Sequence, residues 1–258
     1  MYISSTQNPK IKELAKLKEK KYRDSEKKYL IEGFHLIEMA KDYLLEILTT
    51  DNDFKEFGSI PITYVSSDVI NKLSFTKSPQ PIIGVCKYFD NKVSLKSNTI
   101  ILDNLQDPGN IGAIFRSSLA FGIKDIILSL DSVDIYNDKV IRSSQGAIYK
   151  LNINYLDCID AIKTLKNNGV TVYGTSLQNG TNLKDVKICT PYALILGNEG
   201  NGVNKELLRL TSNNIFIEMT NEIESLNVSI AGAIIMHHFY ECFWENWKNS
   251  LHYIISVL

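Results

Sequence analysis

Residues 104–116 read Asn104-Leu-Gln-Asp107-Pro108-Gly109-Asn110-Ile-Gly112-Ala-Ile-Phe-Arg116. They follow an apolar, strand-like run at 99–103 and lead into an apolar helical pattern. Asp107, Pro108 and Gly109 are typical of a tight turn, so the stretch predicts a strand end that opens into a helix. In α/β folds, ligands bind at strand ends of this kind.

Two later stretches repeat the arrangement. One reads Leu196-Gly197-Asn198-Glu199-Gly200-Asn-Gly202, and the other runs from Ile217-Glu-Met219 into Glu224-Ser225-Leu226-Asn227-Val228-Ser229. Each places turn-forming or polar residues at the end of an apolar run. Three such blocks in the C-terminal half predict one composite site.

From residue 99 onward, strand-like and helix-like segments alternate. This alternation implies an α/β fold with a mostly parallel sheet that is covered on both faces. We expect strands at 99–103, 125–130, 149–155, 171–176, 192–197 and 214–219, and helices at 111–121, 139–144, 159–167, 205–210 and 228–244.

The first 90 residues predict a smaller α/β unit of their own. A polar helix is expected at 10–28 and a second helix at 34–48, with strands at 29–33, 62–65 and 82–88. The stretch 89–97 is polar and poor in strand formers. The predicted divisions are a small domain at 1–90, a linker at 91–98, a main domain at 99–248 and a tail at 249–258.

The 258-residue chain is 44% hydrophobic and 22% charged, with a formal net charge of -1. This composition is ordinary for a globular protein, and the net charge does not indicate a nucleic-acid binder. The charge is uneven, however, because residues 1–28 hold nine Lys or Arg against four acidic residues. This basic arm fits phosphate contacts, and a solvated helix face is the alternative.

The cysteine and histidine patterns exclude several classes of protein. The four cysteines are far apart and form no Cys-x-x-Cys pair, which argues against a zinc site or a disulfide scaffold and for reduced thiols in the cytoplasm. No metal is expected. His237 and His238 are expected to pack or to line an interface. The chain begins without an apolar signal core, and no stretch reaches the ~18 apolar residues of a membrane span. The cysteines are Cys86, Cys158, Cys189 and Cys242.

The first block contains one residue suited to recognising an anion. Arg116 lies six residues after Asn110, so it can project back toward the same end of the sheet. An arginine there suits a phosphate or a polarised hydroxyl. The alternative is a helix cap followed by a surface arginine.

The second and third blocks have structural alternatives as well. Gly197 and Gly200 free backbone groups near Glu199 for a ligand, although an ordinary glycine loop has the same composition. The block lacks the Gly-x-Gly-x-x-Gly spacing of dinucleotide sites, and no Walker A lysine follows. Ser225 or Asn227 is expected to cap the helix at 228–244.

Taken in this order, the blocks resemble the three signature motifs of the SpoU (TrmH-type) RNA 2′-O-ribose methyltransferases, within the SPOUT superfamily. The resemblance covers about residues 99–243, and the segment 142–147 resembles a family segment between the first and second motifs. The N-terminal part, from Asn8-Pro9-Lys10 through Tyr29-Leu-Ile-Glu32-Gly33-Phe34, resembles the substrate-binding domain of rRNA-directed members, which has a ribosomal-protein-like α/β fold. Residues 1–90 are therefore expected to bind RNA and residues 99–248 to be the methyltransferase domain.

The resemblance implies a C-terminal trefoil knot that binds S-adenosyl-L-methionine in a bent shape. It also implies a homodimer whose active site lies near the partner chain. The reaction would be methylation of an RNA ribose without a metal. The implied catalytic residues are Arg116, Asn110, Glu199, Ser225 and Asn227, and the implied cofactor-binding residues are Leu196, Gly197, Gly200, Ile217, Met219 and Leu226.

We expect Arg116 to orient the ribose and to stabilise the developing oxyanion, because a guanidinium stays protonated. Glu199 and Asn110 are expected to hold Arg116 and the loop in place. Ribosomal RNA is the preferred substrate, since simpler tRNA-directed members usually lack an N-terminal domain. The alternatives are a tRNA 2′-O-methyltransferase of the same fold and a catalytically silent RNA-binding SPOUT protein; an antibiotic-resistance role also stays open.

Three positions depart from the family pattern. Glu218 stands where a proline is common, Asn221 lies near a usual glycine, and Asn201 replaces a residue that is often basic.

Overall fold

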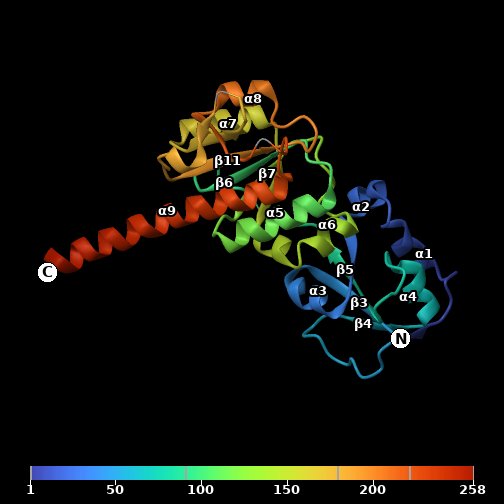
Figure 1. The fold of residues 1–258 in the computed structure, drawn as a ribbon. Helices are drawn as coiled ribbons and strands as arrows, with labels where there is room; N and C mark the ends of the chain where they lie inside the picture. Colours follow the sequence, from blue (N-terminus) through green and yellow to red (C-terminus); the bar gives the residue numbers. More distant parts are fainter. Residues whose placement is uncertain (1, 91, 179, 221, 258) are drawn as a thin grey trace. The chain divides into compact units, whose positions relative to one another are not determined.

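The computed structural model describes residues 2–90, 92–178, 180–220 and 222–257, with side chains described as far as residue 243. The chain clusters into two compact units (Figure 1). Unit 1 consists of Met1–Asp90 and Asp134–Tyr149, and unit 2 consists of Asn91–Val133 and Lys150–Leu258.

Unit 2 is built on a seven-stranded sheet in which every pairing is parallel. The predicted α/β class with a mostly parallel sheet is confirmed. The strand order is β10-β12-β9-β11-β6-β7-β8, with β6 at Thr99–Asp103, β7 at Asp125–Leu128, β8 at Asn152–Tyr155, β9 at Thr171–Thr175, β10 at Thr181–Asn182, β11 at Tyr192–Gly197 and β12 at Asn213–Phe216.

Helices cover both faces of this sheet. Alternate residues of a strand point to opposite faces, and in β11 Ile195 packs with the core formed by α7 and α8. Leu196 points the other way, where its side chain lies against Gly232 of α9, and α9 packs on α5. The bounds are Pro108–Ala120 for α5, Cys158–Asn167 for α7, Lys205–Leu210 for α8 and Val228–Val257 for α9, with a short 3-10 turn, η3, at Leu183–Asp185.

The helix starts follow from local sequence. Asp107 caps α5 by accepting a hydrogen bond from the Asn110 amide at 2.9 Å, and Pro108 occupies the first turn. Several boundaries differ from the sequence expectation, and β7 and β12 end at Leu128 and Phe216, before the predicted 130 and 219. β8 starts at Asn152 because the preceding residues form a 3-10 turn, η2, at Ala147–Lys150. α9 continues through the predicted tail, and the two-residue β10 has no sequence signal.

Unit 1 contains a five-stranded mixed sheet, in which β1, β4 and β3 are parallel while β5 runs antiparallel to β3 and β2. Its strands are β1 at Tyr2–Ile3, β2 at Lys28–Glu32, β3 at Leu44–Thr49, β4 at Ile62–Val65 and β5 at Ile82–Lys87. Its helices are α1 at Pro9–Lys16, α2 at Lys20–Glu26, α3 at Phe34–Met39, α4 at Ser67–Leu73 and α6 at Asp138–Ser143, with a 3-10 turn, η1, at Lys41–Tyr43.

Two helices predicted in this unit have the wrong extent. The helix at 10–28 is two helices, because the Arg23 side chain donates to the carbonyls of Leu17 and Lys18 and closes the turn between them. The helix at 34–48 ends at Met39. The following residues become β3, an interior strand paired with both β4 and β5, and this pairing overrides a helix-like pattern.

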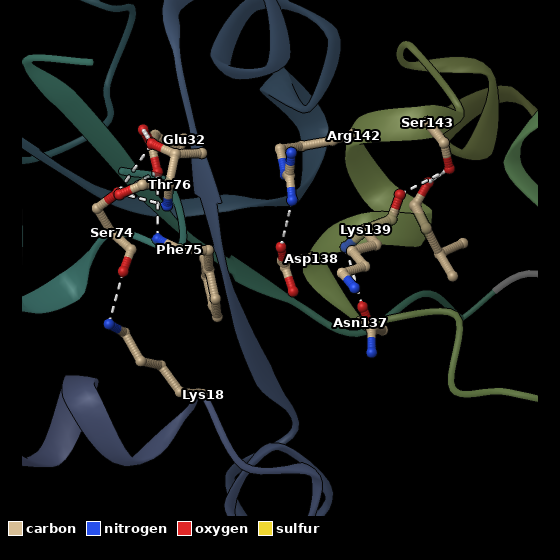
Figure 2. Close-up of polar contacts among 11 residues, drawn as sticks. Lys18, Glu32, Ser74, Phe75, Thr76, Asn137, Asp138, Lys139, Arg142 and Ser143 are labelled. Carbon is tan, nitrogen blue, oxygen red and sulfur yellow. Dashed lines mark hydrogen bonds and ion pairs between the residues drawn. The ribbon is translucent and has the colours of Figure 1, made fainter. Parts of the chain in front are cut away.

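The segment 134–149 leaves the sheet of unit 2 after β7 and returns at β8, yet it clusters with unit 1. Asp134 forms a buried ion pair with Arg23 at 2.6 Å, and the ring of Tyr136 stacks on Tyr88 with centroids 3.6 Å apart. The family-like stretch 142–147 therefore belongs to unit 1. Figure 2 shows Arg142 of α6 pairing with Asp138.

The sequence also led to expectations about membrane spans, cysteines and histidines. In the part of the chain that is described, no helix has the length and apolar character needed to cross a bilayer. None of the four cysteines forms a disulfide; Cys86 and Cys158 are buried, whereas Cys189 is exposed. His237 makes an edge contact with Phe121 and lies 3.4 Å from a Glu241 oxygen.

Candidate active site

The three sequence blocks meet at one edge of the unit 2 sheet. β6 and β11 are adjacent and parallel, with Gly197 opposite Asp103, so the first and second blocks leave the sheet side by side. The Asn198 side chain ties them together by donating to the Asn104 carbonyl at 2.8 Å. Its own oxygen accepts from the amides of Gly200 and Asn201 and shapes the glycine loop.

The Glu199 carboxylate binds the first block. It accepts hydrogen bonds from the backbone amides of Gln106 and Asp107 at 3.5 and 3.2 Å, and from the Asn110 side-chain amide at 3.1 Å. Burial acts to raise the pKa of Glu199, but these hydrogen bonds outweigh it and the pKa is lowered. The side chain is therefore an anion that anchors the start of α5.

The third block joins through Asn110. The Asn110 side-chain oxygen accepts a hydrogen bond from the Asn227 side chain at 2.9 Å. Asn227 in turn caps α9 by accepting from the Ser229 and Ile230 amides at 2.9 and 3.4 Å. Hydrogen bonds thus run from Glu199 through Asn110 to Asn227 and connect all three blocks.

This arrangement predicts an acid-sensitive contribution of Glu199 to stability. Because its folded-state pKa is lowered, the contribution is present above the unfolded value of about 4.3 and is lost as pH falls through the folded value. We expect the melting temperature of Glu199→Gln to lie below that of the wild type at neutral pH, with the gap closing in acid. Thermal melts of both proteins across this range check the expectation, and a gap independent of pH would contradict it.

A cavity of about 590 Å³ opens beside these hydrogen bonds, within the size range of small-molecule sites. Its walls come from the ends of β9, β11 and β12, the loop after β12 and the first turns of α9. All six residues implied to bind the cofactor line it: Leu196, Gly197, Gly200, Ile217, Met219 and Leu226. Glu199, Ser225 and Asn227 also line it, whereas Asn110 and Arg116 do not.

Comparison with known proteins places this chain. Residues 97–237 match the SpoU rRNA Methylase family, and residues 8–84 match the MRM3-like substrate binding domain. The chain belongs to the SpoU rRNA methylase family.

Relatives extend over the whole chain. The Bacillus subtilis 23S rRNA (guanosine(2553)-2′-O)-methyltransferase RlmP is 35% identical over 243 residues, covering 92% of this chain and 98% of its own. A crystal structure of an RNA 2′-O ribose methyltransferase is 27% identical, with a TM-score of 0.80 over 95% of this chain and 100% of its own. The AdoMet-bound rRNA methyltransferase from Sinorhizobium meliloti, 24% identical, shares the fold with a TM-score of 0.85 over 93% of this chain and 97% of its own.

These neighbours agree with the predicted SpoU fold, a mostly parallel α/β sheet preceded by a small α/β domain, and the C-terminal trefoil knot stays a prediction. The backbone geometry explains why residue 197 is a glycine. A Cβ atom at this position would lie 2.1 Å from the Val203 amide nitrogen and 2.2 Å from the Gly202 carbonyl carbon. The glycine is needed for a close approach of the chain to itself, and this approach shapes the cavity wall.

The Arg116 side chain of this SpoU chain is exposed on α5, and its guanidinium makes no hydrogen bond or ion pair with the described residues. The expectation that Glu199 and Asn110 hold the loop in place is confirmed, but neither residue contacts the Arg116 side chain, because both bind the loop and the third block instead. The guanidinium is left available for a substrate. Ser225 is exposed at the cavity, and Asn227 alone takes the capping role.

The departures from the family pattern have different outcomes. Glu218 accepts hydrogen bonds from Lys184 at 2.5 Å and from Asn182 at 3.0 Å, so it ties the loop after β12 to the β10 segment. Asn201 lines the cavity without adding charge. Asn221 lies outside the described residues.

Sequence reasoning missed the contribution of β9 to this site. Thr175, Ser176 and Gln178 line the cavity because β9 lies between β11 and β12 in the sheet. Lys205 supplies a cation to the lining. The signal available beforehand was a strand followed by polar residues, but strand order comes only from the tertiary structure.

Proposed function

We propose that this chain is an S-adenosylmethionine-dependent RNA 2′-O-ribose methyltransferase that acts on ribosomal RNA. The observation that carries the proposal is that hydrogen bonds through Asn110 join the three family motifs at one edge of the sheet, where the second and third motifs line one cavity. The similarity to RlmP along nearly the full chain supports ribosomal RNA as the substrate class.

The cavity fits the cofactor chemically. Leu196, Ile217 and Leu226 present apolar walls suited to an adenine, and the glycine loop exposes backbone groups for polar contacts. Bound S-adenosylmethionine would supply an activated methyl group, so the protein must mainly align the ribose hydroxyl and ease its loss of a proton. No metal takes part in the proposed reaction.

Each catalytic residue has a proposed task. Arg116 orients the ribose and its neighbouring phosphate, and its charge stabilises the developing oxyanion. Glu199 and Asn110 position the start of α5, which carries Arg116. Asn227 fixes the start of α9, and Ser225 presents its hydroxyl at the cavity beside it.

We propose that residues 1–90 form the RNA substrate-binding domain and residues 99–248 the methyltransferase domain. The match of residues 8–84 to a substrate-binding domain and the basic arm support this division. Deleting residues 1–90 would be a poor test, because the segment 134–149 packs against them. The deletion would remove Arg23 and leave the buried Asp134 without its ion-pair partner. Point substitutions on unit 1 test the role without that damage.

A homodimer is also proposed. α9 leaves several large apolar side chains exposed, which is unusual for a free surface. A second copy of this chain is the proposed occupant, because covering these side chains removes apolar area from water, and sedimentation of the purified protein measures the association. The side chains are Ile230 at 53%, Ile234 at 41% and Phe243 at 50% exposure.

The function is tested by methyl transfer from radiolabelled S-adenosylmethionine to purified RNAs. We expect label in 23S rRNA from cells that lack this gene, at a ribose whose 2′-O-methyl group blocks alkaline cleavage of the adjacent bond. Transfer RNA from the same cells is the matched control, and we expect it to stay unlabelled. Label in tRNA alone would replace the proposed substrate. Cofactor binding without transfer to either RNA would support the silent RNA-binding alternative.

A further inference from the structure

The turn between α1 and α2 in unit 1 gathers lysines around an aromatic ring. The ammonium groups of Lys16 and Lys21 lie 5.6 and 4.7 Å from the ring centroid of Tyr22. The four cation–π pairs of the described residues all come from lysines of this arm. The other two are Lys18 with Phe75 at 5.5 Å and Lys27 with Tyr88 at 5.4 Å.

Other basic residues of the arm are occupied in holding unit 1 together. Lys10 pairs with Glu46. Lys18 donates to the Ser74 carbonyl at 2.6 Å, beside the hydrogen bonds of Ser74 to Glu32 (Figure 2). Each of these ammonium groups already has an oxygen partner within unit 1, so an external anion would have to compete with that partner.

Lys16 and Lys21 are in a different position. Lys16 is exposed and has no carboxylate partner among the residues that the structure describes. Among the carboxylates that the structure describes, Lys21 pairs with Glu19 alone, at 3.2 Å, and both side chains are more than three-fifths exposed, at 68% and 62%. An exposed ion pair of this kind contributes little stability, so a phosphate can replace the carboxylate.

The geometry of this cluster is fixed by the fold. Lys16 is the last residue of α1 and Tyr22 lies in α2, so their separation depends on the turn between the helices. Arg23 holds that turn through the carbonyls of Leu17 and Lys18, at 3.0 and 2.8 Å, and is itself only 5% exposed. The half-buried Tyr22 ring is therefore presented in one place, flanked by two exposed lysine side chains.

We propose that Lys16, Lys21 and Tyr22 form a nucleotide platform on which an unpaired RNA base stacks. The flexible lysine heads move from the ring to the flanking phosphates and leave the tyrosine face to the base. Single-stranded RNA is the fitting occupant, because bases in a duplex are stacked on each other and offer no free face. The inference deepens the proposed function by naming which part of the RNA unit 1 holds.

The test measures binding of the full-length protein to two probes, a twelve-nucleotide oligouridylate and a blunt RNA duplex of the same length. Tyr22→Leu is expected to weaken oligouridylate binding about tenfold, the scale of losing one base–aromatic stack, and to leave duplex binding unchanged. Tyr22→Phe keeps the ring and should bind within about twofold of the wild type. Thermal melts verify that each variant is folded.

The lysines are tested by the salt dependence. A double variant that carries Lys16→Gln and Lys21→Gln loses two phosphate contacts. The slope of log affinity against log salt for oligouridylate should therefore become shallower by about 1.4. Lys163→Gln with Lys187→Gln, two exposed lysines of unit 2, is the matched control and should keep the slope.

Equal loss of both probes in Tyr22→Leu, no loss at all, or an unchanged slope in the lysine variant would overturn the platform. Methylation of rRNA by the wild-type protein is scored separately. A failed platform in an active methyltransferase is thereby distinguished from a failure of the proposed function.

Discussion

Arg116→Ala is expected to lower the rate of methyl transfer to RNA about a hundredfold or more, the scale of losing one group that stabilises the transition state. Binding of S-adenosylmethionine should stay nearly unchanged, because Arg116 does not line the cavity. The fold should also be retained, since the exposed guanidinium bonds to no residue that the structure describes. Single-turnover methyl transfer and calorimetric titration of the cofactor measure the two effects separately.

Arg116→Lys distinguishes charge from geometry. Lysine keeps the charge but lacks the planar fork, so it should restore little of the lost rate. Strong rescue would show that charge alone suffices and that the orienting role is wrong. Arg209→Ala removes another exposed arginine of unit 2 and is the control for a general loss of positive charge. Full activity of Arg116→Ala would exclude Arg116 from the active site.

Gly197→Ala and Gly197→Val are expected to abolish measurable S-adenosylmethionine binding. The reason is internal to the chain, because any Cβ atom here meets the backbone of Gly202 and Val203 at 2.1 to 2.5 Å. Backbone atoms cannot move aside cheaply, so the glycine loop must shift and the cavity wall with it. Calorimetric titration measures the loss, and a lower melting temperature should accompany it.

Gly200→Ala provides the comparison for this prediction. Its Cβ atom would lie 3.6 Å from the Asn198 side-chain oxygen, which is ordinary van der Waals contact, so the loop can keep its shape. We expect a normal melting temperature for this variant. Any weaker cofactor binding would then come from a direct clash between the added methyl group and the ligand. Unchanged titration of Gly197→Ala would contradict the assignment of the cavity to the cofactor.

Elements with strong local signals were predicted correctly, whereas an element that depends on strand pairing was not. The strand at 192–197 and the helix at 205–210 have the predicted bounds, because a buried apolar run and an Asn cap are local signals. β3 has no such local signal. Its residues 44–49 carry a helix-like pattern, and only pairing with β4 and β5 makes them a strand.

The candidate site divides in the same way. The sequence by itself determined the residue types, since Gly197, Glu199 and Asn227 follow from motif order and from the chemistry of turns and caps. Which partner each side chain takes was decided only by the tertiary structure. Glu199 binds Asn110 instead of Arg116, and β9 supplies a wall of the cavity. These contacts join positions far apart in the chain, and the order of strands in the sheet, which no local pattern encodes, sets which of them meet.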